Sequence, residues 1–235
     1  MELLHVTDTH LGARWPLIGA PPTLRADDHA RALELALAPA LREEVDLVVH
    51  SGDLFDRSAP DRVAVAVARR LLGEAARRVP VVIIPGNHDR VGLTATIGGL
   101  PGVHVADVPE RRVVGGLALG LVPYCRTAEA FAAAVAGFGA VDLVVAHQAF
   151  DGHRLPPSPG RAAGFRFRVG AQAETIGAQH LPRAVRHVAC GHLHPRQVVE
   201  VGHATVVTPG STERTAFAEA GQTKGYARWR FGASV

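Results

Sequence analysis

The chain has 235 residues, of which 47% are hydrophobic and 20% are charged, and this composition is typical of a globular protein rather than a disordered or fibrous one. No apolar run approaches the roughly 20 residues that a membrane-spanning helix needs, and residues 1–6 show neither the basic region nor the cleavage pattern of a signal peptide. We therefore expect a cytoplasmic protein without a membrane partner, and the net charge of +3 does not by itself indicate a nucleic-acid partner.

The first half of the chain alternates short apolar segments with longer helical ones. Strands are predicted at 3–6, 46–50 and 81–84, and helices at 25–44, with an interruption near Pro39, and at 61–79. This strand–helix–strand alternation is typical of a parallel sheet. Ligands of such sheets lie at the carboxyl ends of the strands, so the turns after these strands are the places to look for a site.

The first two of these turns carry oxygen and imidazole side chains. Asp8 and His10 follow the first strand, and this mixture suits Mn, Fe or Zn better than Ca or Mg. Gly52 permits a tight turn after the second strand, which lets Asp53 point back over the strand end. His50 lies inside that strand, where a hydrogen-bonded core histidine is the favoured interpretation. Each turn alone is a weak signal, because an acidic turn beside a solvated histidine is common.

The third strand ends at Pro85 and Gly86, because proline lacks the N–H that a strand ladder needs and glycine tolerates unusual backbone angles. Directly after them come an amide, an imidazole and a carboxylate: Asn87, His88 and Asp89. A polar turn after a core strand explains this segment as well as a functional site does. The rest of the chain has to decide between them.

The second half predicts another sheet. Short strands of a second sheet are expected at 103–105, 112–114 and 117–122, a helix at 128–138, and further strands at 141–146, 186–189, 197–201, 204–208 and 225–231. Residues 151–168, rich in Gly, Pro and Arg, are either a long loop lining an active-site mouth or a surface excursion. Cys125 and Cys190 have no metal-binding spacing, so buried thiols are expected.

Histidines follow two strands of this second half. His147 ends the 141–146 strand, and His192 and His194 follow a glycine after the 186–189 strand, in a spacing that points both rings at a common centre. One polar turn means little, but five turns drawn from metal-compatible residue types favour a metal site over chance. Their members, in chain order, are Asp8, His10, Asp53, Asn87, His88, His147, His192 and His194.

This ordered set resembles the calcineurin-like metallophosphoesterase superfamily, whose pattern is D-x-H, G-D, G-N-H-D, H and G-H-x-H. Residues 8–12, 52–56, 147–148, 165–168 and 191–197 are similar, more narrowly, to the SbcD-like DNA repair exonuclease group. So is the segment P-G-S-T-E-R-T-A-F-A-E-A-G-Q-T-K-G-Y at 209–226. The blocks span residues 8 to 194, and the tail continues the resemblance to residue 226.

The resemblance implies a four-layer αββα sandwich of two mixed β-sheets flanked by helices, formed by residues 1–235 as a single domain. It also implies two divalent metal ions, Mn first, with Fe, Zn or Co as alternatives. Asp8, His10, Asp53 and His194 would hold one ion, and Asp53, Asn87, His147 and His192 the other, with Asp53 bridging. His88 would protonate the leaving alkoxide, with Asp89 orienting it.

By the same resemblance the chain is expected to hydrolyse phosphodiester bonds of DNA, on single strands or ends. Candidate contacts to substrate phosphates are the arginines near the turns: Arg14, Arg57, Arg90, Arg154 and Arg214. An SMC-like ATPase partner and a capping domain are not expected, because the chain stops soon after the closing strand; a homodimer is an open alternative to a monomer.

Two other functions stay open on the sequence. The first is a phosphodiesterase or phosphomonoesterase of the same superfamily that acts on small molecules such as cyclic nucleotides. The second is a catalytically silent, metal-bound scaffold within a repair or membrane assembly. The intact His88 and the complete ligand set argue against the scaffold.

Overall fold

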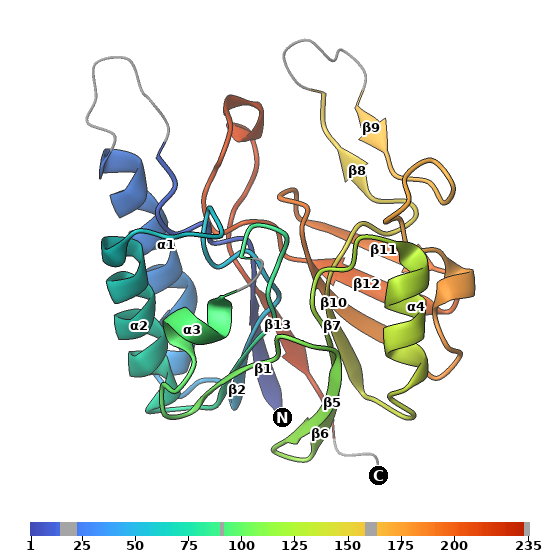
Figure 1. Cartoon of the computed structure of the whole chain (residues 1–235), viewed down its shortest axis with the longest axis horizontal. Helices are drawn as coiled ribbons and strands as arrows, with labels where there is room; N and C mark the ends of the chain where they lie inside the picture. Colours follow the sequence, from blue (N-terminus) through green and yellow to red (C-terminus); the bar gives the residue numbers. More distant parts are fainter. Residues whose placement is uncertain (15–22, 90–91, 158–163, 233–235) are drawn as a thin grey trace.

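The computed structural model describes residues 1–14, 23–89, 92–157 and 164–232. Its secondary structure forms four layers, which Figure 1 shows edge-on. Helices α1 (Thr23–Leu41), α2 (Arg62–Ala76) and α3 (Leu93–Ile97) cover one sheet, and helix α4 (Ala128–Ala136) covers the other. The predicted sandwich of two mixed sheets flanked by helices is confirmed.

The first sheet is parallel except for one edge. Its strand order is β13-β1-β2-β3-β4, with bounds β1 (Glu2–Val6), β2 (Leu47–His50), β3 (Val81–Ile83), β4 (Val103–Val105) and β13 (Ala227–Arg230). Strand β13 pairs antiparallel with β1, and all other neighbours are parallel. The assignment of 103–105 to the second sheet was wrong. Helix α3 provides the crossover that lets β4 lie parallel to β3, with Val103 opposite Val81.

The second sheet has parallel strands in the middle and antiparallel strands at both edges. Its order is β11-β12-β10-β7-β6-β5, with bounds β5 (Glu110–Val114), β6 (Leu117–Val122), β7 (Leu143–His147), β10 (His187–Gly191), β11 (Gln197–Val201) and β12 (Ala204–Thr208). Gly115 and Gly116, with φ of 57° and 87°, turn the β5–β6 hairpin. Apart from 103–105, the predicted strands of this half lie close to their expected positions, although β13 joins the first sheet.

The strands are apolar on both faces because each sheet is covered twice. Leu3 of β1 faces the second sheet, in a shared core with Leu119 of β6 and Val145 of β7. The next residue, Leu4, faces the helices instead and packs in a core with Leu37 of α1. This alternation explains why these strands read as continuous hydrophobic runs rather than as alternating ones.

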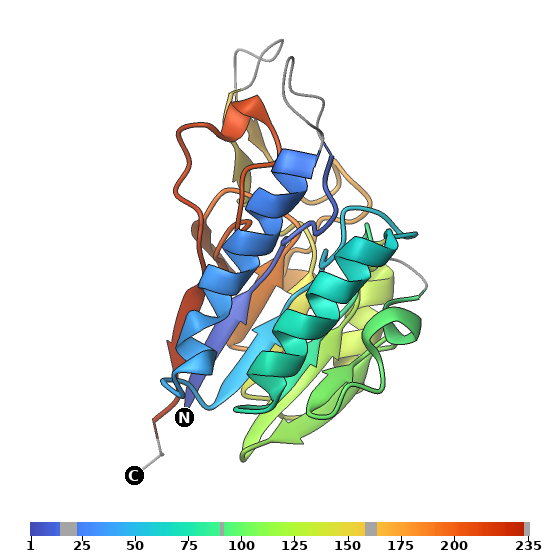
Figure 2. The same cartoon turned by 90° about the vertical axis from the view of Figure 1, so that its left-hand side faces the viewer.

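Helices α1 and α2 lie side by side over the outer face of the first sheet (Figure 2). Asp61 caps the N-terminus of α2, since its Oδ1 accepts from the N–H of Ala64 at 2.8 Å. Helix α1 continues through Pro39 to Leu41, contrary to the expected interruption. Because Pro39 lies only two residues before the helix end, it removes one helical hydrogen bond, and the burial of the flanking helix compensates for this loss.

The described part of the 151–168 segment contains a short hairpin. Strands β8 (Arg154–Leu155) and β9 (Phe165–Arg166) pair antiparallel, and Figure 1 shows them beyond the end of the second sheet where β7 and β10 finish. Two short 3₁₀ turns, η1 (Ala178–His180) and η2 (Phe217–Glu219), lie in the connections before β10 and after β12. Within the described residues, no helix combines the length and the apolar character needed to cross a membrane.

Candidate metal centre

The first part of the site lies where β1 and β2 end. Beyond the strands their backbones stay paired, because Asp8 N donates to Gly52 O at 3.0 Å and His10 N donates to Asp53 O at 3.1 Å. These two hydrogen bonds place Asp8 and His10 directly beside Asp53. The pairing expected of neighbouring parallel strands therefore continues into the turns and sets the position of three predicted ligands.

Four predicted ligands have an unusual backbone conformation. In the part of the chain that the structure describes, five non-glycine residues have a positive φ, and Asp8 (48°), His10 (45°), Asp53 (54°) and His192 (86°) are four of them. Such angles are uncommon for residues with a Cβ and cluster at functional sites, where the surrounding structure maintains them. The strain supports a functional interpretation of these turns.

The remaining imidazoles come from the second sheet. His147 is the last residue of β7, and His192 and His194 follow β10. The two sheets approach closely here: a Cβ on Gly191 would lie 2.2 Å from Thr7 Oγ1 and 2.8 Å from His147 Nδ1. Only glycine at the end of β10 permits this approach.

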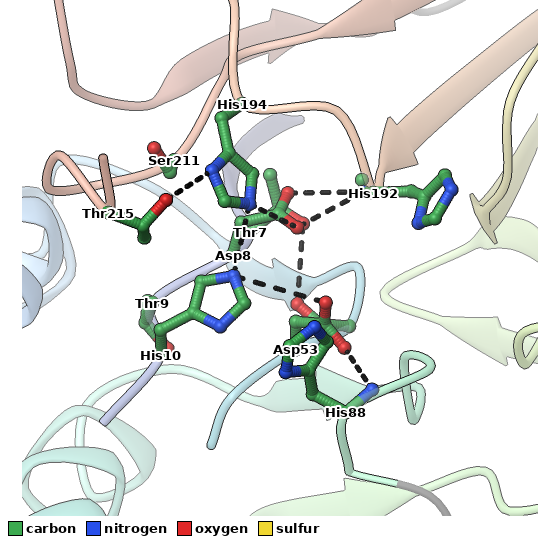
Figure 3. A network of polar contacts seen from close by, with 12 residues as sticks. Thr7, Asp8, Thr9, His10, Asp53, His88, His192, His194, Ser211 and Thr215 are labelled. Atoms are coloured by element: carbon green, nitrogen blue, oxygen red, sulfur yellow. Dashed lines mark hydrogen bonds and ion pairs between the residues drawn. The ribbon is translucent and has the colours of Figure 1, made fainter. Parts of the chain in front are cut away.

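One group of ligand atoms consists of Asp8, His10 and His194, whose atoms lie within 4.8 Å of one another. The Nε2 atoms of His10 and His194 are 3.1 Å apart, and His194 Nε2 is 4.0 Å from Asp8 Oδ1. Figure 3 shows the His194 ring with His10 and Asp8 on one side and Thr215 on the other. The group is closed by residues from both sheets, 184 positions apart in sequence.

The second group surrounds Asn87. Its Oδ1 is 3.1 Å from His147 Nε2 and 2.9 Å from His192 Nδ1. His147 Nε2 is also 3.3 Å from Asp53 Oδ2, and Asp8, Asp53 and His147 form a further cluster of ligand atoms. Asp53 Oδ2 is 3.9 Å from His10 Nε2 in the first group. The Asp53 carboxylate thus lies between the two groups, as a bridging ligand must.

These residues fit two divalent cations. Asp8, Asp53 and His147 are buried, and the site collects carboxylate oxygens, an amide oxygen and imidazole nitrogens. This donor set suits Mn, Fe, Zn or Co. Two imidazole nitrogens 3.1 Å apart, with a carboxylate within reach, are placed as ligands of a common ion are.

The charge balance of the buried site favours positive charge beside Asp53. Burial alone would raise the pKa of the Asp53 carboxyl, but the neighbouring imidazoles, His147 first, lower it below its usual value. Burial alone would lower the pKa of His147, but Asp53 reverses this and raises it to about 9. The carboxylate therefore attracts a cation into the centre, either a proton on His147 or a metal ion.

His88 lies at the exposed edge of the centre. Its backbone N–H donates to Asp53 Oδ1 at 2.8 Å, and its ring Nδ1 donates to the carbonyl of Asp56 at 2.7 Å. Its ring meets that of His10 edge-on, with centroids 4.9 Å apart. The ring is thus fixed beside the ligands with its Nε2 on the opposite side from Asp56.

Asp89 does not have the expected contact with His88. Its carboxylate accepts from the backbone N–H groups of Leu54, Phe55 and Gly86, at 2.8 to 3.1 Å. The orienting contact that the structure shows for His88 is the Asp56 carbonyl, so we correct the expected role of Asp89. A buried carboxylate that joins the turns after β2 and β3 keeps Asp53 and Asn87 in register instead.

Sequence reasoning missed the acidic residues behind the ligands. Glu219 Oε1 is 2.8 Å from His194 Nδ1, and Glu174 Oε1 is 3.9 Å from His192 Nε2. The resemblance of the tail at 209–226 to the family pointed to the segment that contains Glu219, but it did not indicate what Glu219 does. Nothing in the local sequence marks Glu174, because it lies in an irregular segment between η1 and the β9 hairpin.

The predicted phosphate-binding arginines have different environments. Arg14 pairs with Asp61 at 2.5 Å and lines a small cavity together with Arg57, next to the His10 turn. Arg214 donates to the carbonyls of Ala220 and Gln222 and so supports the tail. Arg154 lies in β8, and Arg90 lies outside the described residues.

Two cavities flank the ligands. One, of about 490 Å³, lies beside Asn87 and is lined by Tyr124 and Arg126 among others. The other, of about 400 Å³, lies against His192 and His194 and is lined by Leu155 of β8, Phe167 and the tail around Glu219. Described residues of the 151–168 segment therefore lie beside the ligands.

A family model described as calcineurin-like phosphoesterase matches residues 1–196, which include every predicted ligand. The chain belongs to this family. Calcineurin-like phosphoesterases are metal-dependent hydrolases, and the ligand groups around Asp53 are in keeping with their dinuclear centre.

The chain is also similar to two Mre11 proteins over most of its length. The chain is 27% identical over 240 residues to "DNA double-strand break repair protein Mre11" of Methanosarcina mazei, covering 93% of this chain and 34% of that protein. It is 26% identical over 230 residues to the Mre11 protein of Thermoplasma acidophilum, covering 89% of this chain and 56% of that protein. The chain thus spans about a third to just over half of these relatives.

A similar solved structure is a putative 5'-nucleotidase from Staphylococcus aureus. It superposes with a TM-score of 0.51 at 12% identity, covering 90% of this chain and 48% of that one. At this identity the likeness concerns the fold alone.

Proposed function

We propose that this chain is a metal-dependent phosphodiesterase that cleaves DNA. The observation that carries the proposal is the Asp53 carboxylate, which lies between two groups of metal-compatible side chains, with His88 beside it. The similarity to Mre11 proteins over 93% of this chain supports DNA as the substrate. We propose Mn²⁺ as the metal, since sites of mixed oxygen and imidazole nitrogen ligands accept it.

In this proposal each residue of the centre has a definite task. Asp8, His10, His194 and Asp53 hold one cation, and Asp53, Asn87, His147 and His192 hold the other. When bound, the two cations activate water and stabilise negative charge on the phosphate oxygens during an in-line displacement.

His88 supplies the proton that the leaving group needs. Because Nδ1 is engaged by the Asp56 carbonyl, a proton is given or taken at Nε2. Donation from Nε2 to the leaving 3′ or 5′ oxygen completes hydrolysis, in which water adds to phosphorus and the phosphorus–oxygen bond breaks.

The two flanking cavities support a substrate with more than one nucleotide. Their linings contain different ligands, Asn87 in one and His192 and His194 in the other. A strand that crosses the centre would place a nucleotide in each. Arg126 in the first cavity, and Arg14 and Arg57 at the His10 turn, are the proposed phosphate contacts.

We also propose that residues 1–235 act as one domain, and that the protein works in the cytoplasm as a monomer or homodimer. The buried core shared by both sheets supports the single domain.

The experiment that tests the function incubates the Mn²⁺-loaded protein with labelled single- and double-stranded oligonucleotides, with bis-p-nitrophenyl phosphate as the reference ester. DNA cleavage that EDTA abolishes supports the proposal, and intact DNA alongside rapid cleavage of the reference ester contradicts it.

One observation favours a second candidate, a phosphodiesterase of small nucleotides. The cavity beside Asn87 has room for one nucleotide and contains an aromatic ring and a guanidinium, Tyr124 and Arg126. Arg126→Ala separates the two candidates, with Arg186→Ala, an exposed residue before β10, as the matched control. If the substrate is a polynucleotide, Arg126→Ala should raise the KM for oligonucleotides. If the protein acts on small nucleotides, the unchanged protein should cleave cyclic nucleotides faster than DNA, and Arg126→Ala should raise the KM for cyclic nucleotides.

A further inference from the structure

The tail between β12 and β13 returns to the metal centre. Its 3₁₀ turn η2 places Glu219 behind His194, where the carboxylate side chain is only 10% exposed. Glu219 is not a predicted ligand, and its carboxylate contacts the side of the His194 ring that faces away from Asp8 and His10. A buried carboxylate in this place needs an explanation.

The contacts of Glu219 determine which nitrogen of His194 carries its proton. His194 Nδ1 is 2.8 Å from Glu219 Oε1, and the Thr215 hydroxyl is 2.8 Å from both of these atoms. Because a carboxylate only accepts, Nδ1 must be the donor in the neutral ring. Nε2 then presents its lone pair towards Asp8 and His10, as a metal ligand requires.

Lys224, the sole lysine of the chain, completes the arrangement. Its side chain is 6% exposed, and its Nζ lies 2.6 Å from Glu219 Oε2. Nζ also donates to Ser211 Oγ at 2.8 Å and to the backbone carbonyl of His194 at 3.3 Å. One oxygen of Glu219 is thus engaged by the lysine, and the other is directed at the imidazole.

The other half of the centre is supported differently. His147 Nδ1 donates to the backbone carbonyl of Ser51 at 2.8 Å, so a neutral group orients this ring. A carboxylate partner makes an imidazole a stronger metal ligand than a carbonyl partner does. Glu174 Oε1 is 3.9 Å from His192 Nε2, beyond hydrogen-bond distance, whereas Glu219 Oε1 is 2.8 Å from His194 Nδ1. The two halves of the centre therefore differ in how closely a carboxylate approaches the outer nitrogen of a ligand histidine.

We propose that Glu219, held in place by Lys224, is a positioning residue for His194 and sets the metal affinity of the Asp8–His10–His194 half alone. The inference rests on the two-metal ligand set and not on the identity of the substrate. Its failure would therefore leave the proposed cleavage of DNA unaffected. The family-like tail at 209–226 acquires a function in this way: it delivers a carboxylate to one of the two metal sites.

The test is a calorimetric titration of metal-free protein with Mn²⁺, which resolves two binding events if the two sites differ in affinity. Glu219→Gln keeps the size of the side chain but removes the charge that His194 and Lys224 both contact. We expect one site to lose 10- to 100-fold in affinity, the range typical of lost metal-ligand partners. The affinity of the other site should stay within about twofold.

A second variant and a control distinguish a selective effect of Glu219 from a general disruption of the tail. Glu219→Asp keeps a negative charge near Lys224 but is too short to reach His194, so it should also weaken one site selectively while remaining folded. Glu213→Gln changes another glutamate of the same tail, which contacts Arg25 and Arg214, and should leave both affinities unchanged.

Circular dichroism and urea unfolding of every variant establish whether each one is folded. If folded Glu219→Gln and Glu219→Asp proteins bind both ions as tightly as the unchanged protein, the proposal is wrong. It is equally wrong if both sites weaken by the same factor, because Glu219 would then support the whole centre. Selective loss at one site with both variants establishes it.

Discussion

At the scale of single residues, the centre combines side chains that sequence patterns identify with side chains that only the fold brings in. The ligand turns could be predicted, because each follows an apolar strand and the blocks together are specific. The roles of Asp89 and Glu219 could not be, because they depend on turns that meet only in the folded chain. Asp89 contacts backbone N–H groups 34 and 35 residues away, and Glu219 reaches a histidine 25 residues earlier.

Substitution of His88 tests its proposed role as the proton donor. His88→Ala should lower kcat about 10²- to 10⁴-fold, the usual contribution of general acid catalysis, because the substitution removes the proposed proton donor at Nε2. Metal content, measured by atomic emission, should remain at two ions per chain, because the imidazole of His88 is not a proposed ligand. His187→Ala, at the start of β10, is the control. Unchanged hydrolysis by metal-loaded His88→Ala protein would show that another group is the acid.

At the scale of elements, strand ends position the site, and glycines allow the sheets to meet there. The longer strands were predictable from their runs of hydrophobic residues in the sequence. The membership of β4 in the first sheet was not, because a three-residue strand has no signal of its own and its partner is decided by the crossover through α3. The β8–β9 hairpin, with two residues in each strand, escaped prediction for the same reason.

Substitution of Gly191 tests the close approach of the two sheets. Gly191→Ala places a methyl group 2.2 Å from Thr7 Oγ1 and 2.4 Å from the Ser51 carbonyl, so the end of β10 must move. We expect a loss of about 1–3 kcal/mol in the free energy of unfolding, the usual cost of overpacking, and weaker Mn²⁺ binding because His147 is displaced. In Gly221→Ala the new methyl group meets no atom within 4 Å, and both quantities should be unchanged. Equal behaviour of the two variants would contradict the close approach.

At the scale of the whole molecule, burial by two sheets and two helical layers keeps several histidines neutral. Burial lowers the pKa of His5 and of His153 to about 3. A histidine whose pKa is lower in the folded chain than its usual 6.5 stabilises the fold above pH 6.5. That stabilisation is lost as the pH falls from 6.5 towards 3, because the unfolded chain takes up the proton first.

His153→Gln therefore changes how stability depends on pH. The backbone N–H of Phe150 donates to His153 Nδ1 at 3.1 Å. A glutamine side chain at position 153 cannot titrate. Relative to His153→Gln, the unchanged protein should lose up to about 1.4 kcal/mol of unfolding free energy per pH unit below 6.5. Urea unfolding at pH 7.5, 6 and 5 measures this difference, and His187→Gln provides an exposed control. Parallel curves for His153→Gln and the unchanged protein would show that this ring is not kept neutral.

The proposed centre requires two cations that share the Asp53 carboxylate. Anomalous diffraction from a crystal grown with Mn²⁺ measures this without reference to any substrate. We predict two peaks about 3.5–4 Å apart, one among Asp8, His10 and His194 and one among Asn87, His147 and His192, with Asp53 between them. A single peak, or peaks that do not contact Asp53, would contradict the proposed centre.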